Sequence, residues 1–327
     1  MDVGSHHPRC KPGRLYLHLL TRLALGLLLT LVSITGLAQA VTQVLVIKSD
    51  KSQVYDQVTD QLKRQLDLGC RQVKDCRPVR ISSFVANESK PTYEAYDLVI
   101  TLGVKARRYA KLHLANRQTL NAMVPRELSG ENMDNPGSDQ ATLLLDQPIP
   151  RLLGLVALCS PEMHTLGILY SEENSPLIEE LKKDVAKSGM KLIARLVNDE
   201  SDIGKTLSQL LQEIDVLLAL PDGKIHNRGT VTNILLSSYR NRVPVIAFSA
   251  AYVKAGALGA VYSTPEEIGS HLAEIVEDFL KHGHLTFKYR YPKYFSVSLN
   301  HPVARSLNIK LPSERYLEQQ LEEGEGR

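Results

Sequence analysis

The residues best suited to chemistry in this chain are small polar side chains and tyrosines that follow strand-like apolar runs. In open parallel sheets, ligands bind beyond the carboxyl ends of the strands, and nearby helix N-termini offer N–H donors suited to a carboxylate. Each such residue is also typical of a turn or a helix cap, so the prediction rests on their shared placement. We predict these ligand-binding residues: Ser49, Asp50, Tyr55, Gly103, Ser171, Asn174, Asp222, Ser249 and Tyr252.

Residues arranged for catalysis are absent from the sequence. It contains no GxSxG nucleophile motif, no HExxH zinc motif, no Walker A loop and no GxGxxG dinucleotide motif. His226, His271 and His301 are scattered without the spacing of metal ligands. We therefore predict a binding protein rather than an enzyme, with no catalytic residue, no metal and no cofactor.

Two kinds of apolar run alternate along the chain after residue 40. Strand-like runs cover 43–48, 78–85, 97–103, 120–125, 141–146, 164–171, 191–197, 214–221, 243–249 and 258–263. Helix-like runs cover 52–68, 104–113, 149–160, 175–189, 201–214, 227–242 and 265–283. A polar loop at 126–140 divides this pattern into two blocks, each about the size of one doubly wound domain. We predict an α/β fold with two Rossmann-like lobes, whose parallel sheets are covered by helices on both faces.

The first 40 residues differ from the rest. Four basic residues between 9 and 22 precede an uncharged run at 23–40, which ends in the small-residue pattern Ala38-Gln39-Ala40. This order is typical of a secretory signal peptide, so we expect cleavage after Ala40 and a protein that is free in the periplasm. The alternative is an uncleaved N-terminal anchor, because no charge appears between Arg22 and Lys48.

Loss of the predicted signal peptide changes the charge of the chain. It removes four basic residues and one acidic residue, so the formal net charge falls from +3 to zero. The basic character therefore belongs to the signal, and we expect no nucleic-acid partner. Cys10 lies before the apolar run, so it is not placed as the lipid-acceptor cysteine of a lipoprotein.

Three cysteines stay in the mature chain. Cys70 and Cys76 are separated by five residues, and in an oxidising periplasm they form a plausible disulfide. A metal site is the alternative for this pair, but no further His or Cys cluster lies nearby. Cys159 falls in an apolar helix-like run, so we predict a buried core thiol.

Four ordered blocks of the sequence carry a resemblance to a known family. They are 166–192, the run ALPDGKIHN at 219–227, 240–283, and FSVSLNHPVARSLNIKLP at 295–312. Together these blocks resemble the TrpX-like substrate-binding proteins of ABC transporters. The resemblance implies a type I periplasmic-binding fold, with two lobes joined by three hinge crossings that close over a ligand. It implies a first lobe of 41–145 plus 258–283 and a second lobe of 146–257 plus 284–327.

Members of this family often bind an amino acid, in some cases an aromatic one. The resemblance implies that Asp222 pairs with an ammonium group, that the hydroxyls of Ser49, Ser171 and Ser249 hold a carboxylate, and that Tyr55 or Tyr252 stacks on a flat side chain. It also implies that the helix-like run 265–283 packs on the first lobe. On this view, Asp222→Ala weakens binding and leaves the fold intact.

The resemblance implies a periplasmic solute-binding protein that closes around a small molecule for an ABC-type uptake system. Its partner would be an ABC permease in the inner membrane, and we expect a monomer. One alternative is a ligand sensor of the same fold that serves a receptor or an outer-membrane uptake system. An enzyme that acts on a nucleotide is a third interpretation, but it needs a phosphate loop or an acid–base pair, and the sequence has neither.

Overall fold

The computed structural model describes residues 1, 2, 4, 41–72, 77–88, 96–114, 117–126 and 139–325. The chain forms two compact units, Met1–Val41 and Thr42–Arg327. Nearly all of the predicted signal peptide lies outside the described residues, so it stays a prediction. Within the described ranges, no helix is both long enough and apolar enough to cross a membrane.

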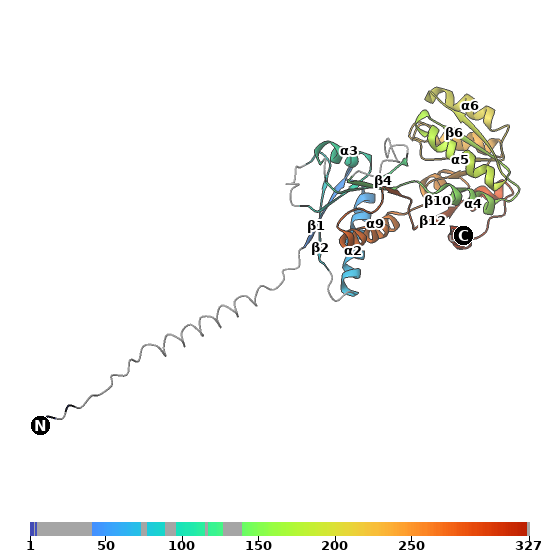
Figure 1. Ribbon diagram of the computed structural model, residues 1–327. Helices are drawn as coiled ribbons and strands as arrows, with labels where there is room; N and C mark the ends of the chain where they lie inside the picture. Colours follow the sequence, from blue (N-terminus) through green and yellow to red (C-terminus); the bar gives the residue numbers. More distant parts are fainter. Residues whose placement is uncertain are drawn as a thin grey trace. The chain divides into compact units, whose positions relative to one another are not determined.

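The first sheet of the larger unit has six strands in the order β11-β5-β4-β3-β1-β2, and every pair is parallel (Figure 1). Its strands are β1 (Thr42–Lys48), β2 (Val79–Val85), β3 (Leu98–Leu102), β4 (Thr119–Val124), β5 (Gln140–Leu144) and β11 (Tyr289–Arg290). The strand β3 is buried along its whole length, as expected for a central strand that is covered on both faces.

Alternation along β1 sends successive side chains to opposite faces of this sheet. Val44 and Val46 pack in one cluster with residues of α2 (Gln53–Gln72) and α9 (Pro265–His282). Leu45 and Ile47 pack in another cluster with residues of α3 (Val104–His113). Helices therefore cover both faces of the sheet, as predicted, and α9 joins the first lobe although it follows a strand of the second.

The second sheet also has six strands, in the order β12-β10-β9-β8-β6-β7. Its strands are β6 (Thr165–Tyr170), β7 (Lys191–Leu196), β8 (Val216–Leu218), β9 (Val245–Ala247), β10 (Gly259–Tyr262) and β12 (Ser296–Leu299). All pairs are parallel except the edge pair of β10 with β12, which is antiparallel. The two sheets confirm the predicted α/β fold with two Rossmann-like lobes.

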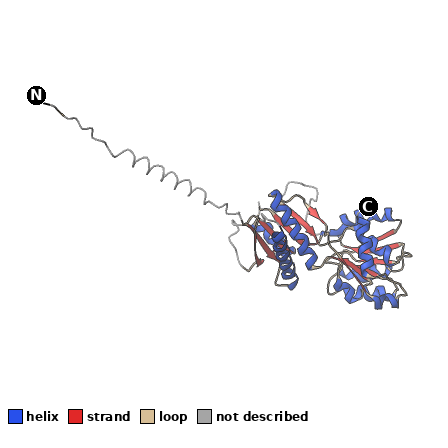
Figure 2. Cartoon of the chain, turned by 90° about the horizontal axis from the view of Figure 1, so that it is seen from below, coloured by secondary structure: helices blue, strands red, loops and turns tan. Residues whose placement is uncertain are grey.

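Helices cover both faces of the second sheet as well (Figure 2). One face packs against α4 (Ile149–Cys159), α5 (Ser175–Ser188) and α11 (Glu314–Glu325), and the other against α6 (Ile203–Leu210), α7 (Val231–Arg240) and α8 (Ala250–Ala255). The remaining short helices are η3 (Glu172–Asn174), η4 (Glu200–Asp202) and α10 (His301–Ser306). Cys159 is buried in the first of these two cores, which confirms its predicted role as a core thiol.

The chain passes between the sheets three times. The crossings are 145–148 between β5 and α4, 263–264 between β10 and α9, and 291–295 between β11 and β12. The second crossing returns α9 to the first lobe, where it lies against α2. A Cβ atom on Gly269 would stand 2.7 Å from the Val58 carbonyl oxygen, so this glycine allows the two helices to approach closely.

The predicted lobe boundaries stay a proposal, with two shifts that the strand pairing suggests. The strand β10 pairs with β9 and β12 in the second sheet, so that lobe extends to about residue 262 rather than 257. The strand β11 pairs with β5 in the first sheet, so the third crossing begins near residue 291 rather than 284. Cys70 lies in α2, but Cys76 lies outside the described residues, so their pairing also stays a prediction.

Candidate functional site

Three of the predicted site residues meet at the carboxyl edge of the first sheet. Ser49 follows β1, and its buried hydroxyl donates to the Leu102 carbonyl over 2.7 Å and accepts from the Ala106 N–H over 3.0 Å. Gly103 precedes α3 with φ 86°, and a Cβ atom there would stand 2.5 Å from the Tyr55 hydroxyl and 2.7 Å from Ser49 Oγ. We call Ser49, Tyr55 and Gly103 the first-lobe cluster.

The fourth predicted residue of this lobe, Asp50, is exposed and shapes the turn before α2. Its Oδ1 accepts from the Ser52 N–H over 2.8 Å, as in an Asx turn. Asp50 nevertheless acts on the cluster through its charge. Burial raises the pKa of Tyr55, the Ser49 hydrogen bond opposes this, and the charge of Asp50 raises the pKa further.

In the second lobe, Asp222 brings Ser171 and Asn174 together. Its Oδ2 accepts from the Ser171 N–H over 2.8 Å and from Asn174 Nδ2 over 2.9 Å, while its Oδ1 accepts from the N–H groups of Lys224 and Ile225. Burial alone would raise the pKa of Asp222, but the hydrogen bonds from Asn174 and Ser171 bring it below its ordinary value. Donors of the chain itself therefore already occupy both carboxylate oxygens of Asp222. Through these hydrogen bonds, Asp222 holds the ends of β6 and β8 together.

The last two predicted residues, Ser249 and Tyr252, lie at the start of α8. Ser249 is its N-cap, and its side chain accepts from the Tyr252 N–H over 3.2 Å. The buried Tyr252 hydroxyl lies 2.9 Å from His226 Nδ1, and its ring packs edge-on to Phe248 at 5.5 Å. Burial raises the pKa of Tyr252 and lowers the pKa of His226 to about 4, so this pair is neutral near pH 7.

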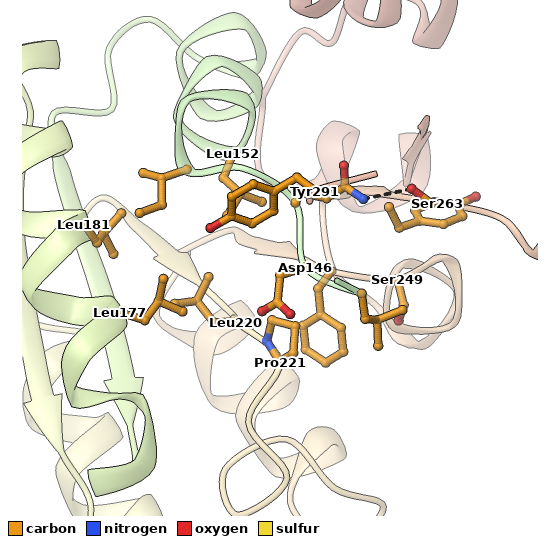
Figure 3. A pocket seen from close by; sticks show the side chains of 14 residues that line it. Asp146, Leu152, Leu177, Leu181, Leu220, Pro221, Ser249, Ser263 and Tyr291 are labelled. Atoms are coloured by element: carbon orange, nitrogen blue, oxygen red, sulfur yellow. Dashed lines mark hydrogen bonds between the residues drawn. The ribbon is translucent and has the colours of Figure 1, made fainter. Parts of the chain in front are cut away.

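A cavity of about 180 Å³ lies where β8 and β9 end and the crossing segments begin (Figure 3). Its apolar lining consists of Leu145, Ile149, Leu152, Leu177, Leu181, Leu220, Pro221 and Phe248. Its polar lining consists of Asp146, Gln147, Ser249, Tyr262, Ser263 and Tyr291. The three crossings each contribute to this wall, so movement at the hinge would reshape the cavity.

Asp146 is the only charged side chain among the described residues that line this cavity. In Figure 3 its carboxylate lies between the leucines of α4 and α5 and the hydroxyls of Ser249 and Ser263. The carboxylate is only 7% exposed, and its Oδ2 accepts from the Arg126 N–H over 2.6 Å. Burial raises the pKa of Asp146 from 3.8 to about 6, against the opposing effect of the N–H groups and charge of Arg126.

The Arg126 side chain extends the polar region beside this carboxylate. It donates to the Tyr291 hydroxyl over 2.7 Å and forms an ion pair with Glu180 of α5. Arg126 follows β4 of the first sheet, so this contact links the first lobe to the third crossing and to the second lobe. Among the described residues, no group of three His, Cys, Asp or Glu side chains is placed to hold a metal ion.

Sequence reasoning found one residue of this cavity, Ser249, and missed the others. Asp146 stands directly after the strand-like run at 141–145, so the same strand-end rule could have selected it. Arg126 and Tyr291 carry no such signal, because they come from segments that meet only in the folded chain. Ser171, Asn174, Asp222 and Tyr252 lie outside the cavity lining.

Two parallel-sheet lobes, three crossings and a cavity at the strand ends define a type I binding protein. The chain belongs to the ABC transporter substrate binding protein family, whose model matches residues 135–319. A curated relative, the tyrosine-binding protein of Clostridioides difficile (strain R20291), is 23% identical over 154 residues. That alignment covers 46% of this chain and 44% of the relative, so the chain matches less than half of the relative's length.

Solved structures show the same fold. A ligand-free, open substrate binding protein with adhesive properties from Clostridium difficile has a TM-score of 0.66 at 18% identity, covering 84% of this chain and 97% of its own. The ABC domain in complex with L-Trp from Streptococcus pneumonia has a TM-score of 0.59 at 17% identity, covering 85% and 98%. At these identities the likeness establishes the fold.

Proposed function

We propose that this protein is the solute-binding component of an ABC-type uptake system and that it binds a small amino acid with an apolar or aromatic side chain. One observation carries the proposal. A single buried carboxylate, Asp146, stands in an otherwise uncharged and mainly apolar cavity at the ends of β8 and β9. A ligand that fits such a cavity combines a cationic group with an apolar body.

The apolar part of the cavity suits one side chain of moderate size. An engineered apolar cavity of about 150 Å³ is known to accept benzene, and the volume here is about 180 Å³. Phe248 contributes an aromatic face, and the leucines of α4 and α5 contribute aliphatic contacts. The tyrosine bound by the curated relative has a ring of the appropriate size, which supports an aromatic amino acid as the first ligand to test.

The ammonium group of the ligand would lie at Asp146. A carboxylate whose pKa is raised to about 6 by burial is poorly stabilised in its charged form, so it gains from a cationic partner. Asp222 is a weaker candidate for this role, since four donors of the chain already occupy its oxygens. We therefore move the predicted ammonium contact from Asp222 to Asp146 and give Asp222 a structural role.

Ser49, Tyr55 and Gly103 stay predicted ligand contacts, on the other lobe. The hydroxyls of Ser49 and Tyr55 and the start of α3 lie at the carboxyl edge of the first sheet, which is the binding edge in this class of fold. In our proposal, closure about the three crossings brings this edge to the ligand. Because contact with both lobes exists only in the closed form, the ligand would shift the population toward it.

The ligand is tested on purified protein from residue 41 onward. We expect L-tyrosine or L-tryptophan, at about 100 times its dissociation constant, to raise Tm by about 5 °C or more. Calorimetry then gives the dissociation constant for wild type and for Asp146→Asn. The matched control is Asp184→Asn, a half-buried carboxylate of α5 outside the cavity lining. A panel of amino acids that leaves Tm unchanged would contradict the proposal. Equal affinities of wild type and Asp146→Asn would show that Asp146 does not contact the ligand.

The cellular part of the proposal concerns export and the partner. Proteins that serve ABC uptake systems act outside the cytoplasm, so we propose that residues 1–40 direct the chain to the periplasm and are removed there. N-terminal sequencing of the periplasmic protein should begin at Val41, whereas an intact Met1 would favour the anchored alternative. The proposed partner is an inner-membrane ABC permease, and the ligand-loaded protein should stimulate ATP hydrolysis by that transporter.

A further inference from the structure

A chain of hydrogen bonds joins all three crossings behind the cavity. Arg151 Nη1 of α4 donates to Gln147 Oε1 over 2.5 Å, and Gln147 Nε2 donates to Ser263 Oγ over 3.0 Å. Ser263 Oγ in turn donates to the Tyr294 carbonyl over 2.6 Å. Gln147, Ser263 and Tyr294 belong to the first, second and third crossing respectively. We call this series the crossing relay.

The direction of the crossing relay is set by chemistry at both of its ends. A guanidinium has only donors, so the Gln147 amide must turn its oxygen to Arg151 and its nitrogen to Ser263. A backbone carbonyl has only acceptors, so the Ser263 hydroxyl must donate to Tyr294 and accept from Gln147. Gln147 lines the cavity, and one of its two amide N–H bonds is used on Ser263. Among the described residues, Ser263 Oγ is the acceptor found for this amide nitrogen, so in our proposal the other N–H serves an acceptor on a bound molecule.

Arg151 itself does not line the cavity, yet it is the anchor of the crossing relay. Its side chain is 2% exposed and also donates to the Pro292 carbonyl of the third crossing over 3.1 Å. The Phe295 ring lies 4.0 Å from its guanidinium carbon. A buried cation needs a counter-charge, and Glu325 of α11 supplies it with two bonds, 2.5 Å from Nε and 2.6 Å from Nη2.

The helix α11 is held close enough to α4 for this pairing. A Cβ atom on Gly154 would stand 2.7 Å from Leu321 Cδ2, so the small residue lets the two helices touch. Leu317 and Leu321 are buried in the core that α4 shares. The position of Glu325 is therefore set by the packing of α11 against α4.

We propose that Arg151, neutralised by Glu325, is a positioning residue that makes Gln147 present an N–H donor to the cavity and so selects ligands that carry a carboxylate beside their ammonium group. The inference rests on the proposed function, because it assigns the second polar group of the same ligand. Asp146 would take the ammonium, and the adjacent Gln147 would donate to a carboxylate oxygen. A simple amine has no group for Gln147 and gains nothing from the crossing relay.

The test compares L-tyrosine with tyramine, and L-tryptophan with tryptamine, which differ only in the carboxylate. Three variants are measured by calorimetry against wild type: Glu325→Gln, Arg151→Met and Gln147→Glu. We expect the first two to lose about tenfold in affinity for the amino acids and less than twofold for the amines. Gln147→Glu keeps an acceptor for Arg151 but replaces the N–H by a charged oxygen. It should weaken amino acid binding most, while its added negative charge should leave amine binding as tight as in wild type or tighter.

Glu322→Gln is the matched control, because Glu322 lies on α11 one turn before Glu325, is exposed, and is not among the hydrogen-bond partners of Arg151 in the described part of the chain. It should leave all four affinities unchanged. Amine binding by each variant also shows that the site has folded. Unchanged ratios of amino acid to amine affinity in Glu325→Gln and Gln147→Glu would overturn the role of the crossing relay. If wild type itself bound none of the four compounds, the failure would lie with the proposed function instead.

Discussion

The backbone N–H of Arg126 donates to the Asp146 carboxylate over 2.6 Å, which joins the end of β4 to the first crossing. The same arginine uses its side chain on Tyr291 of the third crossing and Glu180 of α5. Arg126, a single residue that follows a first-lobe strand, therefore contacts two crossings and the second lobe. The carboxylate at the centre of this arrangement is buried, and the charge of Arg126 offsets only part of the effect of burial on its pKa, which has consequences that can be measured.

Asp146 should make the ligand-free protein less stable as the pH rises. Its pKa is raised from 3.8 to about 6 in the folded chain, so between these values the folded state binds more protons than the unfolded state. Stability from this group therefore falls as the pH rises from about 4 to 6, and the loss is complete above 6. Asp146→Asn should be more stable than wild type at pH 7.5, by up to about 3 kcal/mol, and similar to it at pH 4.

Urea unfolding of both proteins at these two pH values measures this difference. Asparagine keeps an acceptor for the Arg126 N–H, so the comparison isolates the charge. Equal stability of variant and wild type at pH 7.5 would mean that the carboxylate is well compensated in the folded chain. The argument for a cationic ligand group would then lose its main support.

His226 should have the opposite dependence on pH. Burial lowers its pKa from 6.5 to about 4, so the unfolded state binds more protons between these values. The stability that His226 contributes is present above pH 6.5 and is lost as the pH falls toward 4, by roughly 3 kcal/mol. His271 also has its pKa lowered to about 4 by burial, so it adds to the same slope.

Replacement of His226 by asparagine should reduce the loss of stability between pH 6.5 and 4. The part of this loss that is due to His271 should remain. Thermal unfolding between pH 4 and 7 gives the slope for wild type, His226→Asn and the double variant with His271→Asn. A slope that does not change in either variant would show that the two histidines are solvated in the folded protein.

Gly103 should be far less tolerant of alanine than a second glycine with a similar backbone. Gly103 and Gly189 have φ values of 86° and 77°, but only Gly103 has neighbours, Tyr55 and Ser49, within 3 Å of an added Cβ atom. We expect Gly189→Ala to cost about 1 kcal/mol from the backbone alone, and Gly103→Ala to cost about 2 kcal/mol more. Chemical denaturation measures both, and equal costs would contradict the close packing of the first-lobe cluster.

The same pair of variants tests the cluster as a ligand contact. The displaced Tyr55 and Ser49 should weaken amino acid binding in Gly103→Ala, while Gly189→Ala, at the exposed end of α5, should bind like wild type. Binding that survives in Gly103→Ala would separate the first-lobe cluster from the ligand.

Asp222→Ala should lower stability, contrary to the expectation from the sequence that the fold would be unaffected. The variant leaves the N–H groups of Ser171, Lys224 and Ile225 and the Asn174 amide without their acceptor. Loss of several buried hydrogen bonds to a charged group should cost about 3 kcal/mol or more. The control is Asp184→Ala, which removes an ion pair with the exposed Lys187 and should change stability by less than about 1 kcal/mol.

A urea midpoint for Asp222→Ala equal to that of wild type, together with a large loss of affinity, would restore Asp222 as the ligand's ammonium partner. A lowered midpoint with a proportionate loss of affinity would fit its structural role.

The fold was open to prediction because its signals are local. Alternating strand-like and helix-like runs specify parallel sheets with helices on both faces, and polar residues after Ile47 and Leu102 mark the edge where strands end. Ser49 and Gly103, both selected by the strand-end rule, lie close together, and so do Ser171 and Asp222. Their contact with a ligand stays a prediction. The prediction did not include Asp146, although this residue also follows a strand. The strand-end rule does not indicate which strand ends face a cavity.

The sequence by itself determined the class of fold and the resemblance to a binding-protein family, since periodicity and ordered motifs are properties of neighbouring residues. Only the tertiary structure decided that Asp222 is saturated by its own chain while Asp146 is the charge in the cavity. It also brought Arg126 to Tyr291 and Arg151 to Glu325 across more than 160 residues each. Burial and counter-charges depend on how distant segments pack, and no local pattern records them.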